Sequence, residues 1–273
     1  MLFRSTFQNG NDQDLIPLTA AGKVDVALAD GTSVVPAVSQ AIPIQYVATI
    51  YGQFPNIVFA KQSAGISKPA DLKGKKLGTP GKYGSSWGML QAMLDSAGLK
   101  PTDLTITEYP DYGQGTAVAK GAVDAATGYA NNEVVQLGLA GEKLTVIKVD
   151  SIIALPGPGM IVGKPVIDDA ARKAAVKKFV AATLQAMKEI VATPSKGVDA
   201  AIKAVPDLAA SKATQEAILA ATIDVWKSPL TESKGLGAID GNGWTKTIEY
   251  LGKLGLTQKT ITVADATRSD MLP

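Results

Sequence analysis

The chain has 273 residues, with 27 basic and 25 acidic side chains, and its 46% apolar composition is enough to form a buried core. It contains no cysteine and no histidine, which excludes disulfides, thiolate nucleophiles, Ser-His-Asp hydrolysis and zinc sites with His or Cys ligands. No block of one charge stands out, which argues against a nucleic-acid surface. Binding, or chemistry with carboxylate, Lys or Tyr groups, remains, and we expect neither a metal nor a cofactor.

Short apolar runs alternate with helical patterns over the first half of the chain. Strands are predicted at residues 2–7, 24–29, 44–51, 56–60, 76–79, 104–109, 123–128 and 144–149, and a further apolar run at 160–162. Helices are predicted at residues 11–21, 32–40, 85–97, 113–120 and 132–140, the second of them capped by Thr32 or Ser33. Helices between apolar strands at this spacing predict an α/β fold of βαβ units with a parallel sheet. No stretch reaches eighteen apolar residues, so no membrane span is predicted.

The last third of the chain is nearly all helix, at residues 168–192, 211–227 and 242–254. These helices have no sheet of their own, so they must cover one that is already formed. We therefore predict one lobe from residues 1–60 plus 160–273 and a second from 61–159. The hinge is expected near 60–76 and 150–160. Two lobes on a two-strand hinge are suited to closing around a ligand, which would contact the loops that follow the strands.

Aromatic side chains gather at these loops. Four lie at or just past the carboxyl end of a predicted strand: Tyr51, Tyr83, Tyr112 and Tyr129. Flat rings there suit a flat ligand by stacking. Tyr46 and Tyr109 lie inside strands and are expected in the core. For Trp87, which shares a helix side with Leu90 and Leu94, core packing and ligand contact stay equally open.

A Gly/Ser-rich segment, residues 79–86, leads from a strand into a helix. Free N–H groups at the helix start can hold an oxygen-rich ligand, so Gly84, Ser85 and Ser86 are candidate contacts. The alternative is that a serine only caps its own helix. The run 84–88 also matches the G-x-S-x-G pattern around a nucleophilic Ser86, but no histidine is present to activate it.

Polar residues at the junction of a strand and a helix form a second candidate group. Asn131, Asn132 and Glu133 can read the polar edge of a heterocycle, because amides donate and accept while a carboxylate accepts. The alternative is that they cap the helix. Asp30, after the strand at 24–29, points toward the same rim. Asp111 precedes Tyr112 in a tight turn and either reaches the cleft or fixes the turn.

At these loops the sequence resembles the type II periplasmic solute-binding proteins of ABC importers, in the branch that carries the thiamine pyrimidine precursor and riboflavin. The segments 21–27, 71–78 and 129–133 carry the resemblance. Pyrimidine-binding relatives use an Asn-Glu pair at the junction that matches Asn132 and Glu133. Segments 81–87 and 109–114 are most similar to the riboflavin-type members.

The resemblance implies a two-lobed clamshell with two Rossmann-like parallel or mixed sheets. It implies a solute-binding protein whose ligand is riboflavin as the best guess, or the hydroxymethylpyrimidine precursor as the alternative. The implied partners are this small molecule and an ABC permease. The expected protein is a monomer, periplasmic or otherwise extracytoplasmic, with or without a lipid anchor, although no signal segment is present in the sequence. The strand and helix with which the family begins, ahead of residues 2–7, are also missing.

The same superfamily contains an enzyme branch that makes the thiamine pyrimidine and consumes an active-site histidine. Because this chain has no histidine, we expect a binding protein and not an enzyme. A sensor that uses the same clamshell without an importer stays open as a third hypothesis.

Overall fold

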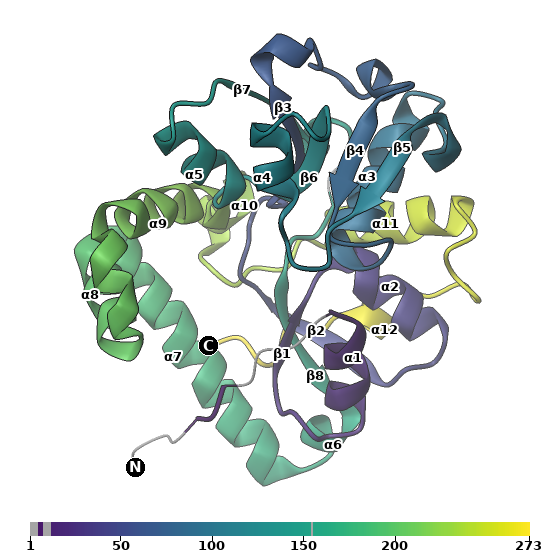
Figure 1. Cartoon of the computed structure of the whole chain (residues 1–273). Coiled ribbons are helices and arrows are strands. Elements are labelled where there is room, and N and C mark those ends of the chain that lie inside the picture. Colours follow the sequence, from purple (N-terminus) through teal and green to yellow (C-terminus); the bar gives the residue numbers. More distant parts are fainter. Residues whose placement is uncertain (1–4, 8–11, 154) are drawn as a thin grey trace.

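The protein folds around two separate β-sheets that are joined by two crossings of the chain (Figure 1). The computed structural model describes residues 5–7, 12–153 and 155–273. We call each sheet with the helices that cover it a lobe.

The three-stranded lobe is built on the strands β1 (Ala27–Ala29), β8 (Gly159–Gly163) and β2 (Ile44–Thr49), in that order, with β8 antiparallel to both neighbours. Its helices are α1 (Asp12–Ala20), α2 (Gly31–Ser39), α6 (Lys164–Ile167), α7 (Ala170–Ala192), α11 (Gly241–Lys253) and α12 (Val263–Ala266). Apolar side chains of α1, α2 and α11 fill one face of this sheet, around Trp244. The stripe of α7 that includes Val176, Val180 and Met187 fills the other face.

The five-stranded lobe has the strand order β5-β4-β6-β3-β7. Its strands are β3 (Asn56–Lys61), β4 (Lys76–Thr79), β5 (Thr105–Glu108), β6 (Ala125–Tyr129) and β7 (Leu144–Lys148). Helix α3 (Gly84–Ser96) covers one face, and α4 (Gln114–Ala119) with α5 (Glu133–Leu139) covers the other.

A further helical group is counted with the three-stranded lobe, because α8 packs on α7 and Trp226 at the end of α9 packs on the core of that lobe: α8 (Pro194–Ala204), α9 (Lys212–Trp226) and α10 (Pro229–Lys234). Helices α8 and α9 pack on each other, and α9 also packs against α5 of the five-stranded lobe (Figure 1). Short 3-10 helices lie at Gln62–Ala64, Pro69–Leu72, Pro101–Asp103, Val149–Ser151 and Pro206–Ser211.

The predicted α/β class is confirmed, but the expected parallel pairing holds only in part. Strand β4 is parallel to β5 and β6, whereas β3 and β8 are antiparallel to every strand they pair with. The physical reason is the crossings. Each one brings the chain into the other sheet at the edge where the neighbouring strands end, so the new strand runs in the opposite direction.

The predicted lobe boundary at residue 60 is wrong. Strand β3 hydrogen-bonds to β6 and β7, so residues 56–60 belong to the five-stranded sheet and the chain crosses at 51–55. The connector at 61–76, expected as part of the hinge, is also part of that lobe. Its Ile66 and Leu72 are buried in the core under α3. Apolar burial of a Gly/Lys/Pro-rich segment is not visible in its composition.

Three local predictions also change. The predicted strand at 2–7 falls partly outside the described residues, and residues 5–7 have no regular structure. Asp30 caps α2 in place of Thr32 or Ser33, because its carboxylate accepts the Thr32 N–H at 2.8 Å. Pro194 breaks the preceding helix as expected but also begins α8, where a missing N–H costs nothing.

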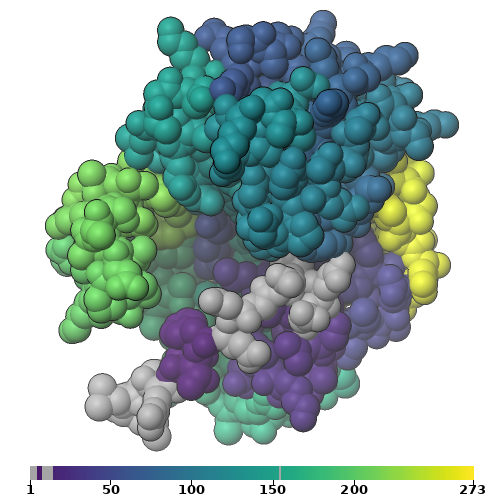
Figure 2. All heavy atoms as spheres, in the orientation of Figure 1, coloured from purple at the N-terminus to yellow at the C-terminus, as the bar shows by residue number. Residues whose placement is uncertain are grey.

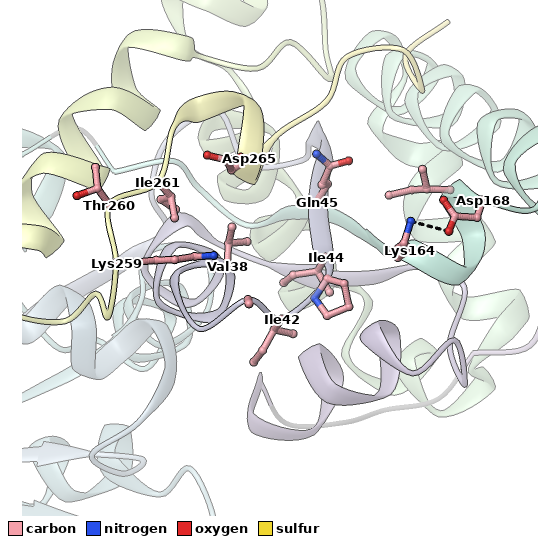
Figure 3. Close-up of a pocket in the computed structure, with 13 residues that line it drawn as sticks. Val38, Ile42, Ile44, Gln45, Lys164, Asp168, Lys259, Thr260, Ile261 and Asp265 are labelled. Carbon is pink, nitrogen blue, oxygen red and sulfur yellow. Dashed lines mark ion pairs between the residues drawn. The ribbon is translucent and has the colours of Figure 1, made fainter.

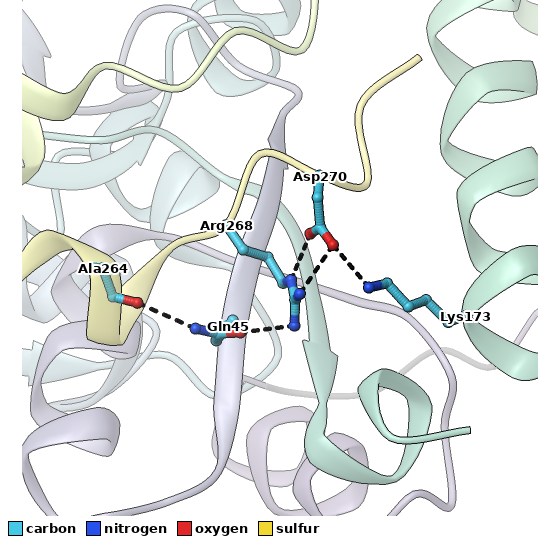
Figure 4. Close-up of polar contacts among 5 residues, drawn as sticks. All are labelled: Gln45, Lys173, Ala264, Arg268 and Asp270. Carbon is cyan, nitrogen blue, oxygen red and sulfur yellow. Dashed lines mark hydrogen bonds and ion pairs between the residues drawn. The ribbon is translucent and has the colours of Figure 1, made fainter. Parts of the chain in front are cut away.

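The C-terminal segment is tied to the three-stranded lobe by charged side chains (Figure 4). Arg268 donates to both carboxylate oxygens of Asp270, at 2.6 and 2.9 Å, and to the side-chain oxygen of Gln45 on β2. Lys173 on α7 donates to Asp270 at 2.7 Å. Hydrogen bonds from these two cations hold the pKa of Asp270 well below its usual range. This contact connects α7, β2 and the chain end.

The two crossings are held to each other by Asp150. Its carboxylate, which follows β7, accepts the backbone N–H of Phe54 in the first crossing at 3.0 Å. Burial raises the pKa of Asp150 to about 6, against the opposing effects of this bond and of Lys148. The folded chain therefore binds the proton of Asp150 more tightly than the unfolded chain does.

This raised pKa predicts a pH-dependent stability. The folded pKa lies above the unfolded value near 4, so the contribution of Asp150 is most favourable at low pH and is lost as pH rises through about 6. Asp150→Asn should lessen the fall in stability between pH 4.5 and pH 7 by about 1–2 kcal/mol. Urea unfolding at both pH values measures this, with the exposed Asp207→Asn as the control. An equal fall in wild type and Asp150→Asn would contradict the prediction.

Candidate functional site

The loops from both lobes face one another across the crossings. The carboxyl ends of β4 and β6 lie at the same edge as the start of β3, because β3 runs antiparallel to β6. In the other sheet, the ends of β1 and β2 lie beside the start of β8. The crossings join these two edges. Figure 2 shows the surface hollowed between the five-stranded lobe, the green α8–α9 pair and the purple N-terminal part of the chain.

Asn56 and two serines form the first polar group at this edge. The Asn56 side chain is fully buried at the start of β3 and donates to the hydroxyls of Ser85 and Ser86, at 3.2 and 3.0 Å. Both serines lie in the first turn of α3. No described residue bonds the amide oxygen of Asn56. Asn56 of the sheet thus fixes both serine hydroxyls. No side-chain hydrogen bond caps the start of α3 in the described structure.

Asn131 forms the second polar group, together with residues of the other lobe. Its side chain is 7% exposed, and its Nδ2 donates to the Thr222 hydroxyl on α9 at 2.9 Å. It also hydrogen-bonds to Tyr51, whose pKa is raised by burial. One turn beyond Thr222, the indole nitrogen of Trp226 is buried without a partner among the described residues, as is the amide oxygen of Asn131. This group joins β6, α9 and the end of β2.

Glu133 secures the junction between β6 and α5. Its carboxylate accepts the Tyr129 N–H at 2.8 Å and the Gln114 side-chain N–H at 3.2 Å. Burial raises the pKa of Glu133. Gln114 is itself buried, and its amide oxygen has no partner among the described residues. The chain itself thus supplies donors to both oxygens of Glu133, and ligand contact by Glu133 stays a prediction.

Tyr83 and Gly84 set the entry into α3. The Tyr83 ring lies over Gly81, and Tyr83 is half-buried. Gly84 has φ +62, a conformation that costs a residue with a Cβ more than it costs glycine. Trp87 packs partly against the core under α3, which favours its core role.

Asp30 and the helix that it caps lie against α3 of the other lobe. Asp30 is only 2% exposed, and its carboxylate accepts from both the N–H and the hydroxyl of Thr32. Thr32 lies so close to Gly88 that an added Cβ on the glycine would come within 3.0 Å of it. Asp30 thus positions the start of α2 where the two lobes touch.

The remaining predicted residues lie at the rim. Asp111 accepts the Gly113 N–H at 3.1 Å, so it fixes the turn, one of the two roles considered for it. Tyr112 is 58% exposed with φ +59. The exposed Asn132 accepts from Gln136 at 2.6 Å on the surface of α5 and makes no cap bond. Tyr46 is fully buried and packs edge-on against Trp244, as its place inside a strand predicts.

Four residues of this edge were not predicted as site residues from the sequence: Asn56, Gln114, Thr222 and Trp226. Asn56 could have been found from the sequence, because it is a polar amide at the first position of an otherwise apolar predicted strand. Thr222 and Trp226 belong to a helix that the sequence assigns only to covering a sheet. No local pattern shows that this helix reaches the opposite lobe.

Two cavities of about 400 and 490 Å³ lie away from this edge, on the three-stranded lobe. Figure 3 shows the first of them. They share Lys259, Thr260 and Ile261, and none of the predicted site residues lines either. Several polar side chains around the first are paired within the chain: Lys164 with Asp168 at 2.7 Å, and Gln45 with Arg268 at 3.2 Å. Nothing there calls for a ligand.

No group of acidic side chains in the described part of the chain is arranged to hold a metal ion. In the same residues, no helix combines the length and the apolar character needed to cross a membrane.

The fold is that of periplasmic solute-binding proteins. The alkanesulfonate-binding protein SsuA of Xanthomonas axonopodis pv. citri superposes with a TM-score of 0.68 over 93% of this chain and 84% of that one, at 18% identity. At this identity the likeness shows the fold alone.

The chain belongs to the NMT1/THI5-like family, whose model matches residues 6–197. It is similar to the riboflavin-binding protein RibY of Chloroflexus aurantiacus, with 31% identity over the whole chain and 77% of that protein. It is also similar to a 4-amino-5-hydroxymethyl-2-methylpyrimidine phosphate synthase of Saccharomyces cerevisiae, with 26% identity over 53% of the chain and 44% of the enzyme.

The contacts of Glu133 predict a structural effect. Glu133→Ala would leave the Tyr129 N–H and the Gln114 amide without their acceptor, so it should lower the free energy of unfolding by about 1–3 kcal/mol. Glu133→Gln keeps one acceptor oxygen and should cost less. Chemical denaturation of both variants measures this, with the exposed Glu216→Ala as the control. Wild-type stability in Glu133→Ala would contradict the role.

Proposed function

We propose that this chain is the solute-binding protein of an ABC importer and binds a planar nitrogen heterocycle between its lobes. Riboflavin is the first candidate for this ligand, and we infer that the protein does not transform it. The observation that carries the proposal is a set of buried polar atoms at these edges that have no hydrogen-bond partner among the residues the structure describes. Three are amide oxygens, on Asn56, Gln114 and Asn131, and one is the indole nitrogen of Trp226.

Such atoms are costly, because a buried polar group without a hydrogen bond loses about 1–3 kcal/mol. A ligand that carries both donors and acceptors would remove this cost, whereas an apolar ligand would not. The rings of Tyr51, Tyr83 and Tyr129 at the same edge offer stacking surface for a flat molecule. RibY supports riboflavin, since the similarity covers the whole of this chain.

The pyrimidine precursor of thiamine is the second ligand candidate. Membership of the NMT1/THI5-like family favours it, and an aminopyrimidine also carries donors and acceptors on one edge. The isoalloxazine ring and ribityl chain of riboflavin would use more of the polar atoms and rings, which places riboflavin first.

The rest of the proposal follows from this role. The protein would work outside the cytoplasm as a monomer and deliver its ligand to a membrane permease. An enzyme related to the pyrimidine synthase is the competing function. Only carboxylate, Lys and Tyr groups could transfer a proton in this chain, because it has no histidine. Mass spectrometry of ligand recovered after incubation separates the two functions, since a chemically altered product would favour the enzyme.

Titration with riboflavin tests the ligand. Stacking on aromatic rings should quench flavin fluorescence on binding, and excess hydroxymethylpyrimidine should compete weakly. Tight pyrimidine binding with no flavin quenching would reverse the order of the two ligands.

Tyr83 provides a test of the site. Tyr83→Ala should weaken riboflavin binding by roughly 1–3 kcal/mol, about 5- to 150-fold, if the ring stacks on the ligand. The unfolding temperature should change little, because Tyr83 is half-buried at a loop end. Wild-type affinity in this variant would remove Tyr83 from the site.

A further inference from the structure

The side chain of Asn131 hydrogen-bonds to residues of the other lobe. Its Nδ2 reaches Thr222 on α9, which lies far along the chain in the helical group beyond the second crossing. This contact joins the end of β6 in the five-stranded lobe to α9.

The Thr222 hydroxyl fixes which way the Asn131 amide points. Thr222 donates its hydroxyl proton to the Ile218 carbonyl at 2.7 Å, one turn back along α9. That proton is therefore not available to Asn131, and the hydroxyl can only accept from it. Asn131 must turn its nitrogen toward α9, which leaves its oxygen without a donor among the described residues, in a residue that is only 7% exposed.

A buried amide oxygen held in this way selects for a ligand with a hydrogen-bond donor. Trp226 lies four residues after Thr222 and so on the same face of α9, and its buried N–H has no acceptor in the described part of the chain. A planar ring with an N–H beside a carbonyl or ring nitrogen meets both requirements. Oxidised isoalloxazine has a single ring N–H, at N3, with a carbonyl on each side.

We propose that Asn131 reads an N–H on the ligand's heterocycle through Oδ1, and that Thr222 of the opposite lobe is the positioning residue that orients it. The inference rests on the proposed function, since it assigns the polar edge of the same ligand.

The test compares riboflavin with 3-methylriboflavin, in which a methyl group replaces the N3 proton. Wild type should bind riboflavin at least about tenfold more tightly than the methylated compound, as expected for one lost hydrogen bond to a buried acceptor. In Asn131→Ala and in Thr222→Val the ratio of the two dissociation constants should fall below about three.

Thr183→Val is the matched control. Thr183 on α7 also donates to the carbonyl four residues before it, at 3.0 Å, but it takes no part in the site. This variant should keep the wild-type ratio. Because the readout is a ratio of two ligands on the same protein, a general loss of stability does not imitate the effect.

Each outcome decides the question. A wild type that binds both flavins equally, or an Asn131→Ala variant that keeps the ratio, overturns the inference while the proposed function stands. A Thr222→Val variant that alone keeps the ratio overturns the positioning role. If wild type binds no flavin, the same ratio is measured with 4-amino-5-hydroxymethyl-2-methylpyrimidine and its 4-dimethylamino analogue. Discrimination there supports the inference and rejects riboflavin, whereas binding of neither pair overturns both.

Discussion

The crossing of the chain between two sheets, once at residues 51–55 and once at 152–158, is the constraint on which the structure depends. It places the ends of β1, β2, β4 and β6 at facing edges, and it reverses β3 and β8 relative to their neighbours. The bond from the Phe54 N–H to Asp150 joins the two crossings. A site assembled at these edges belongs to both lobes, so any movement between the lobes would alter it.

The contacts between the lobes are of two kinds. Helix α2 of the three-stranded lobe packs against α3 of the five-stranded lobe, with Thr32 close to Gly88. Polar contacts add to this packing: Asn131 bonds Thr222 at one side, and on another side the Tyr250 hydroxyl donates to Asp95 at 3.2 Å. Such polar contacts are individually weak, because folding exchanges them for bonds to water.

Buried polar groups separate two kinds of residue at this edge. Asp30, Asp111 and Glu133 use their carboxylates on backbone N–H groups of their own loops, so they shape the site. Asn56 and Asn131 donate hydrogen bonds through the amide nitrogen, while their amide oxygens have no partner among the described residues. The sequence predicts both the carboxylates and Asn131 as candidate ligand contacts, because all of them follow predicted strands. Their roles differ through partners that only the folded chain provides.

The sequence by itself determined the α/β class, the order of strands β1 to β8 and of the helices other than α6, α8, α10 and α12, and the loops at which a site could form. These depend on local periodicity, on caps and on glycine stops, which act over a few residues. Only the tertiary structure decided that β3 joins the five-stranded sheet, that 61–76 is buried within a lobe, and that α9 brings Thr222 and Trp226 to Asn131. Those outcomes depend on contacts between residues far apart in the chain, for example 91 positions between Asn131 and Thr222. No pattern within a short window of sequence records such a contact.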